Sequence, residues 1–393
     1  MRKRKIQRKN LLLIFLIFFS LFISGIFLYL IIEEQRGSQG ERYHQEAIRI
    51  YEECLTPQDA NCYEKKFKEL ARARGLDFAE QTLYKLWDLD ETTRRCHVIA
   101  HTIAKEAVRE NPEKWKDYFK NVNYSTCSTG FLHGVMEAHI GDDPDFELNS
   151  KVINELCFDT DDFYRKHNCV HFTGHLFMVQ YEGDMKHALD GCEGVNEDLT
   201  KRCYTGVFME DSFPLALVEH GIRSKLPNRQ GSDFIAKQEA RCTQYEGDRA
   251  ISCWTDMGEN YGVFFDNPQK VYDSCSKTPS GATMKNCFMK ATGLFAIHPA
   301  YSTNEKLIGI CLPAKNDENL FRSCIGNMIS SLLYYSPNFS ERGVKLCSSL
   351  DGSYGNSCFD QLKRQIAFIA GDELEREKFC RRLSPKHKYL CRS

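Results

Sequence analysis

Residues 267–297, NPQKVYDSCSKTPSGATMKNCFMKATGLFAI, show the pattern that decides the fold. An amphipathic segment ends at Cys275, a polar turn with Pro and Gly follows, and Cys287 opens an apolar segment. Apolar residues at helical spacing on either side of such a turn are typical of two neighbouring antiparallel helices. The stretch therefore predicts a helix, a loop and a second helix, with a disulfide across the loop.

The pattern recurs along the chain, for example at CYTGVFME (203–210) and CIGNMISSLLYY (324–335). The second-helix cysteines, with Cys96 and Cys127 included, stand at positions 62, 96, 127, 169, 203, 253, 287, 324, 358 and 391. Most of the intervals between them are close to a period of about 34 residues, which is typical of α/α solenoids. We therefore predict an all-α fold in which disulfide-rich α/α hairpins repeat with that period.

The cysteine and histidine patterns divide the chain beyond residue 40 into three predicted parts. Residues 41–210 hold His-rich α/α repeats, residues 211–233 form an insertion marked by the longest interval, and residues 234–393 hold the C-terminal stapled repeats. Insertions in solenoids often fall on one working face.

Eighteen cysteines without any C-x-x-C motif favour structural disulfides over zinc ribbons and redox motifs. Cys96 and Cys127 each open a second helix without a partner at the end of the first. Because the starts of neighbouring second helices lie side by side in a stacked array, we predict that these two bond to each other. The predicted bridges are Cys54–Cys62, Cys96–Cys127, Cys157–Cys169, Cys192–Cys203, Cys242–Cys253, Cys275–Cys287, Cys311–Cys324, Cys347–Cys358 and Cys380–Cys391.

In period and cysteine placement, residues 40–393 resemble Sel1-like and TPR-like repeat proteins, especially the secreted cysteine-rich type with stapled α/α hairpins. The resemblance implies a binding surface built from stacked helices. It implies no particular activity.

The N-terminus predicts a membrane anchor. Residues 1–10, MRKRKIQRKN, carry six Lys or Arg and no acid, and the run at 11–32 is mostly apolar. A helix of that length spans a bilayer core, and the positive-inside rule places the basic tail in the cytoplasm. We predict a transmembrane signal-anchor helix at 11–32, a linker at 33–40 and an extracytoplasmic body at 36–393. A cleaved signal peptide is the alternative, and it also leads to an exported body.

Charge and cysteine content restrict the partners and the compartment. Without the first ten residues, the chain carries 46 basic and 54 acidic side chains. Nucleic-acid binding needs a basic face, so we expect no nucleic acid. Disulfides persist in oxidising compartments, which favours a periplasm, a cell surface or a secretory lumen.

Histidines are concentrated in one part of the repeat array. Eight of the twelve lie between residues 97 and 187, and three consecutive repeats each carry a pair spaced i,i+4. Such a pair shares a helix face, so each supplies two ligands for a metal ion. The pairs are His97 with His101, His133 with Glu137, and His171 with His175. We predict a site for a divalent metal, zinc, copper or iron, with the five histidines as ligands.

Two acidic residues are candidate catalytic groups at this site. Glu137 belongs to the second pair, and Glu210 lies early on the next repeat's second helix, as a fourth ligand or a general base. A metal with an open coordination position beside either carboxylate would activate water, or would bind dioxygen if it were iron or copper. Hydrolysis and oxidation both remain open at this stage.

A non-enzymatic interpretation competes with the metal site. Helix histidines are often partly buried residues that hydrogen-bond to their neighbours, and six matched residues fit that interpretation about equally well. The chain would then be a non-enzymatic scaffold that presents a solenoid groove to a protein, peptide or glycan at the cell surface. Loss of a bound metal on changing His171 and His175 would separate the two.

Overall fold

The computed structural model describes residues 39–55, 62–90, 96–121, 127, 130–141, 148–159, 163–196, 198–212, 233–335, 339–350, 352–369, 376, 380–381 and 383–391. The predicted anchor at 11–32 and most of the predicted insertion at 211–233 lie outside the described residues. No helix of the described part is both long and apolar enough to cross a membrane.

The described residues are helical, with no strand among them, which confirms the all-α class. They belong to two compact units, one ending at Thr93 and one beginning at Arg94. In the first unit, the helix at 39–54 is followed by α2 (Cys62–Arg74) and α3 (Leu76–Leu89). Ile50, Phe67 and Leu86 are fully buried and form part of its core.

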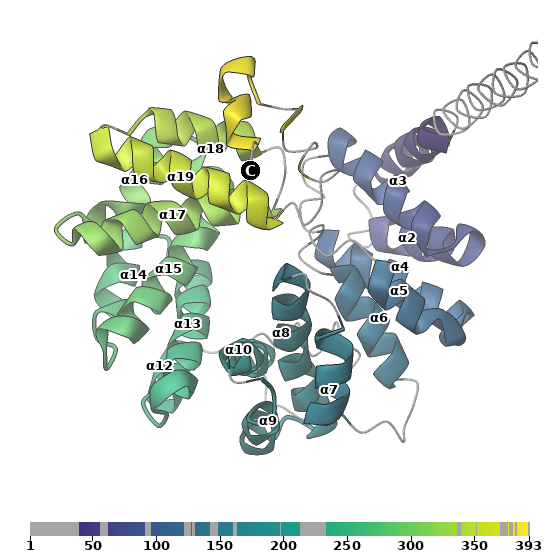
Figure 1. The fold of residues 1–393 in the computed structure, drawn as a ribbon, viewed down its shortest axis with the longest axis horizontal. Helices are drawn as coiled ribbons and strands as arrows, with labels where there is room; N and C mark the ends of the chain where they lie inside the picture. Colours follow the sequence, from purple (N-terminus) through teal and green to yellow (C-terminus); the bar gives the residue numbers. More distant parts are fainter. Residues whose placement is uncertain are drawn as a thin grey trace, which may run out of the picture. The chain divides into compact units, whose positions relative to one another are not determined.

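In the second unit, shorter helices alternate with longer ones (Figure 1). The longer helices are α4 (Cys96–Glu110), α6 (Gly130–Gly141), α8 (Phe163–Gln180), α10 (Thr200–Ser212), α13 (Gly247–Phe264), α15 (Gly281–Ile297), α17 (Glu318–Tyr335) and α19 (Gly352–Ile369). The shorter ones are α5 (Trp115–Asn121), α7 (Ser150–Cys157), α9 (Met185–Cys192), α12 (Phe234–Cys242), α14 (Pro268–Cys275), α16 (Asn304–Cys311) and α18 (Phe339–Ser348). The 3-10 turns are η2 (Pro112–Lys114), η4 (Pro299–Tyr301), η5 (Leu312–Ala314) and η6 (Pro385–Cys391).

Successive long helices pack against each other in chain order, from α4 with α6 to α17 with α19. From α5 onward, each short helix packs on the long helix that follows it. Figure 1 shows α13, α15, α17 and α19 in succession. This is the repeat-like arrangement that the period predicts, and it places equivalent positions of neighbouring long helices next to each other.

All nine predicted disulfides are present, and no cysteine is free. In most hairpins the first cysteine ends the short helix, as Cys275 ends α14. In α8, α10, α13, α15, α17 and α19 the second cysteine lies inside the long helix instead of opening it, which corrects the predicted start. Cys62 and Cys96 do open α2 and α4 as predicted, whereas Cys127 lies ahead of α6 and Cys391 ends η6. In α15 the helix begins at Gly281, because Ser280 and Thr283 form a reciprocal capping box ahead of Cys287.

Glycine allows the long helices to approach each other closely around the histidines. A Cβ at Gly206 on α10 would meet the backbone carbonyl oxygen of His171 on α8. A Cβ at Gly134 on α6 would meet that of His101 on α4 in the same way. Because the nearest atoms belong to the neighbouring backbone, a larger residue at either position would push the helices apart, and these glycines have a structural role.

Candidate metal centre

His97, His101 and His133 come together between α4 and α6. One nitrogen from each ring lies within 4.8 Å of the other two, and among the described residues this group could hold a metal ion. His101 and His133 are each 5% exposed, and His97 is half-buried. The i,i+4 spacing on α4 supplies two rings, and the close α4–α6 contact supplies the third.

A hydrogen bond orients the His97 ring, and a carboxylate oxygen lies beside the His101 ring. The Nδ1 atom of His97 lies 3.1 Å from the carbonyl oxygen of Cys127, and Nδ1 of His101 lies 3.0 Å from Oε2 of Glu137. A carbonyl oxygen can only accept, so His97 carries its proton on Nδ1 and keeps the lone pair of Nε2 for a ligand. Histidine ligands in proteins commonly donate their other N–H to a carbonyl or a carboxylate in this way.

The Cys96–Cys127 disulfide takes part in this arrangement. Cys127 has a φ of 53°, a left-handed conformation that is costly for a residue with a side chain. The disulfide links it to Cys96, the residue before His97. The bridge therefore holds the Cys127 carbonyl where it accepts the His97 hydrogen bond.

Glu137 is paired on both of its oxygens. Oε2 contacts His101, and Oε1 accepts a hydrogen bond from Nζ of Lys105 at 2.5 Å. The carboxylate is nearly buried, and the lysine compensates its charge. It lies behind the His101 ring, a position suited to orienting the imidazole; its predicted role as a catalytic base stays a prediction.

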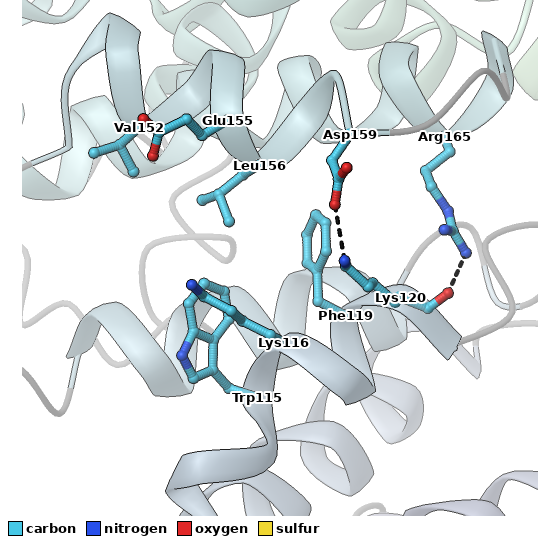
Figure 2. A pocket seen from close by; sticks show the side chains of 9 residues that line it. All are labelled: Trp115, Lys116, Phe119, Lys120, Val152, Glu155, Leu156, Asp159 and Arg165. Carbon is cyan, nitrogen blue, oxygen red and sulfur yellow. Dashed lines mark hydrogen bonds and ion pairs between the residues drawn. The ribbon is translucent and has the colours of Figure 1, made fainter.

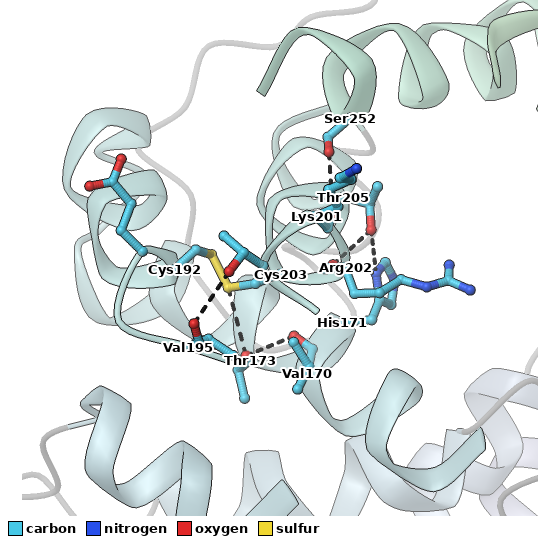
Figure 3. Close-up of a disulfide and its surroundings, with 12 residues drawn as sticks. Val170, His171, Thr173, Cys192, Val195, Lys201, Arg202, Cys203, Thr205 and Ser252 are labelled. Carbon is cyan, nitrogen blue, oxygen red and sulfur yellow. Dashed lines mark hydrogen bonds between the residues drawn. A yellow bond between two sulfur atoms is a disulfide. The ribbon is translucent and has the colours of Figure 1, made fainter. Parts of the chain in front are cut away.

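His171 and His175 form an adjoining pair on α8. Their Nε2 atoms are 3.3 Å apart, and Nδ1 of His175 lies 2.5 Å from Oε2 of the fully buried Glu210 on α10. Figure 3 shows His171 beside Thr205 and Arg202, also on α10, and its Nδ1 is 3.1 Å from the Thr205 hydroxyl. Glu210 thus lies beside Nδ1 of His175 as Glu137 lies beside Nδ1 of His101. Glu210 is in the last turn of α10, whereas the sequence predicted a position early on the helix.

Aromatic contacts connect the two histidine groups. Phe172 stacks on His133 with ring centroids 4.1 Å apart, and the His133 and His175 centroids are 5.7 Å apart. The five predicted ligands therefore lie in one continuous cluster, but they form a group of three and a group of two. The prediction of a single five-ligand site did not anticipate this division.

Burial keeps His167 and His171 on α8 neutral. It lowers the pKa of His171 well below its ordinary value, and the neighbouring His175, Arg202 and Lys290 lower it further. The pKa of His167 is lowered to about 4, by burial first and then by Arg202. Neutral imidazoles are the form that binds metals, so the His171 ring is in the metal-binding form at neutral pH.

Two of the cavities in the second unit lie near the His-rich repeats. One, of about 310 Å³, runs across the long helices beside His171 and has a polar lining that includes Thr205, Glu259, Lys290, Asn327 and Gln365. The other, of about 290 Å³, lies between α5 and α7, where Trp115 and Phe119 face Leu156 (Figure 2). None of the predicted metal ligands lines this second cavity.

Some contacts of the site were not foreseen from the sequence. The orienting groups of His97 and His171 include backbone carbonyl oxygens, which no residue pattern reveals. Asp256, on α13 in the first cavity, is also buried; its side chain accepts a hydrogen bond from Ser212, and burial raises its pKa to about 7. The sequence signal that could have revealed Asp256 was the set of polar residues along α10 and α13.

In comparisons with known proteins, no protein family, no curated protein and no solved structure matches this chain.

Proposed function

We propose that the protein binds a divalent metal ion through His97, His101 and His133, as a membrane-anchored, extracytoplasmic helical-repeat protein. The observation that carries the proposal is the convergence of one nitrogen from each of these three rings within 4.8 Å. The Cys127 carbonyl at Nδ1 of His97 and the Glu137 carboxylate beside Nδ1 of His101 leave the Nε2 atom of each ring to bind the ion.

The donor set favours zinc, with copper and iron as alternatives. Three histidines with a fourth position left to water or substrate are typical of catalytic zinc sites. A bound metal of this kind supplies Lewis acidity and lowers the pKa of a coordinated water. This supports a catalytic role, in hydrolysis or in oxidation, with Glu137 beside His101 and Glu210 beside His175 as the candidate carboxylates.

Location and architecture form part of the same proposal. Nine disulfides fit an oxidising compartment, and the apolar run at 11–32 with its basic flank supports a single anchor with a cytoplasmic N-terminus. The stapled hairpins, packed in chain order, support assignment to α/α solenoids of the Sel1-like or TPR-like kind.

A non-enzymatic scaffold is the second candidate function. The polar cavity across the long helices favours it, because its lining of amide, hydroxyl and charged side chains suits an extended polar ligand. A peptide or a glycan would fit this chemistry, as would a loop of a partner protein. This function requires no metal.

The decisive experiment is the metal content of the full-length protein, produced with its disulfides formed and purified in detergent. We expect His97→Ala and His133→Ala each to lose one ion per chain relative to the wild type, measured by plasma mass spectrometry. His187→Ala is the matched control, because His187 is an exposed histidine held by Asp184 outside the cluster.

An equal metal content in all four proteins would refute the proposed metal site. Circular dichroism and denaturant unfolding of each variant would show that its fold is retained. The scaffold would then be the better description, to be tested by peptide and glycan binding to the polar cavity.

A further inference from the structure

The pair His171 and His175 lies beside the proposed three-histidine site and is not part of its ligand set. Its geometry carries an inference of its own. The two Nε2 atoms are 3.3 Å apart, in a region where His175 is 2% exposed. The position of the proton on each ring decides whether the two Nε2 atoms share a hydrogen bond or can bind a cation.

The hydrogen bonds of His171 fix its proton on Nδ1. This atom lies 3.1 Å from Oγ1 of Thr205 and 3.3 Å from the carbonyl oxygen of Arg202. The Thr205 hydroxyl donates its own proton to that same carbonyl oxygen, at 2.7 Å. Both neighbours of Nδ1 therefore accept, and Nε2 of His171 carries a lone pair.

The same reasoning applies to His175 through Glu210. Its Nδ1 lies 2.5 Å from a carboxylate oxygen of Glu210, and both side chains are buried. A carboxylate accepts a hydrogen bond from Nδ1–H, which leaves the lone pair on Nε2. Two lone pairs then lie 3.3 Å apart, an arrangement that a cation bound to both nitrogens stabilises.

The spacing of the two nitrogens fits two ligands of one metal ion. Zn–N bonds of about 2.0–2.1 Å at a tetrahedral angle place two nitrogens about 3.3–3.4 Å apart. A hydrogen bond between the two rings would need a proton on one Nε2, but the acceptors at both Nδ1 atoms already hold the single proton of each neutral ring. The 3.3 Å between the two Nε2 atoms is the separation expected for two ligands of one ion.

The polar cavity beside His171 supplies the rest of a coordination shell. His171 and Thr205 line this cavity of about 310 Å³, so water or a polar ligand has access to the pair. An ion held by two imidazoles and completed from the cavity has open positions. The three-histidine group lies next to it, with His133 and His175 ring centroids 5.7 Å apart.

We infer that His171 and His175 bind a second divalent metal ion, oriented by Thr205 and Glu210 and open to the polar cavity. The protein then carries two neighbouring metal ions, of which the second meets polar ligands from the cavity. The inference goes beyond the proposed function, since it uses a different ligand set. Either site can fail without the other.

Titration with Co²⁺ tests the inference on full-length protein freed of metal by a chelator. We expect about two ions per chain in the wild type, and about one in His171→Ala and in His175→Ala. His167→Ala is the matched control, because His167 lies one turn earlier on α8 and lines the same cavity without belonging to the pair. It should bind as many ions as the wild type.

A more conservative variant tests the pair without removing either imidazole, so that loss of the fold is not the cause of weaker binding. Thr205→Val removes only the hydroxyl that orients His171, and should weaken binding of the second ion about 10–100-fold with the first unchanged. The inference is overturned if His171→Ala, His175→Ala and Thr205→Val all bind as many ions as His167→Ala with unchanged affinity. Loss of an ion in His97→Ala alone would then support only the three-histidine site.

Discussion

Replacing Gly134 with alanine tests whether the close approach of α4 and α6 builds the three-histidine site. A Cβ at this position would meet the carbonyl oxygen of His101 and lie 2.8 Å from the Cβ of Ala104. Neither group is the flexible end of a side chain, so the helices must move apart. His133 precedes Gly134, and its ring centroid lies 5.6 Å from that of His101, so the same movement disturbs the cluster.

The magnitude follows from two opposing effects. Alanine is a better helix former than glycine by about 1 kcal/mol, but overpacking a close contact costs about 1–3 kcal/mol. At Gly134 we expect the clash to prevail, so that the free energy of unfolding falls by about 1–2 kcal/mol. At Gly326 a Cβ would lie 3.4 Å from Cγ of Gln361, which is ordinary contact. Gly326→Ala should therefore be neutral or stabilising by up to about 1 kcal/mol.

The assay is guanidinium unfolding followed by circular dichroism, with the disulfides kept intact, together with zinc titration. We expect zinc to bind Gly134→Ala about tenfold more weakly, the order of effect that poorly oriented ligands produce. If Gly134→Ala is as stable as Gly326→Ala and binds zinc as the wild type does, the helix contact does not position the histidines.

Two further predictions concern charge and crosslinks. Burial raises the pKa of Asp256 from 3.8 to about 7, so the folded state binds more protons than the unfolded state between those values and stability falls as pH rises from about 4 to 7. At about 1.4 kcal/mol per tenfold change in acidity, this loss of stability is up to about 4 kcal/mol. Unfolding measured at pH 5 and pH 7.5 should show that the stability of Asp256→Asn depends less on pH than that of the wild type. An equal pH dependence in the two proteins would contradict the raised pKa of Asp256. Serine at both Cys96 and Cys127 opens a loop of sequence separation 31, against 12 for Cys275 and Cys287. The chain-entropy model predicts that the free energy of unfolding falls by about 3.7 kcal/mol without Cys96–Cys127 and by about 2.8 kcal/mol without Cys275–Cys287. Denaturant unfolding of the two double variants measures both losses. Only the variant without Cys96–Cys127 should also bind zinc more weakly.

The fold was largely predictable because the cysteines repeat with the period of the helices. Cys96–Cys127 could be predicted because the starts of neighbouring second helices lie side by side in a stacked array. Helix starts were less predictable, since the segment before Cys287 has the polar composition of a turn. There the capping box of Ser280 and Thr283 begins the helix earlier than composition indicates.

The candidate site was predictable in its membership but not in its grouping. The i,i+4 spacing places His171 beside His175, yet it does not say which pairs from different helices share an ion. That depends on the exact approach of neighbouring helices and on backbone acceptors such as the Cys127 carbonyl. The left-handed conformation of Cys127, which its disulfide holds, leaves no signature in the sequence around it.

The order of the disulfides has a consequence for biosynthesis. Every cysteine is bonded to the one next to it along the chain, from Cys54–Cys62 to Cys380–Cys391. If the repeats enter an oxidising compartment in chain order, the next cysteine to enter after each unpaired thiol is its native partner. An oxidant that joins thiols in order of appearance therefore makes the native set without reshuffling, and the slow exchange of mispaired bonds is avoided.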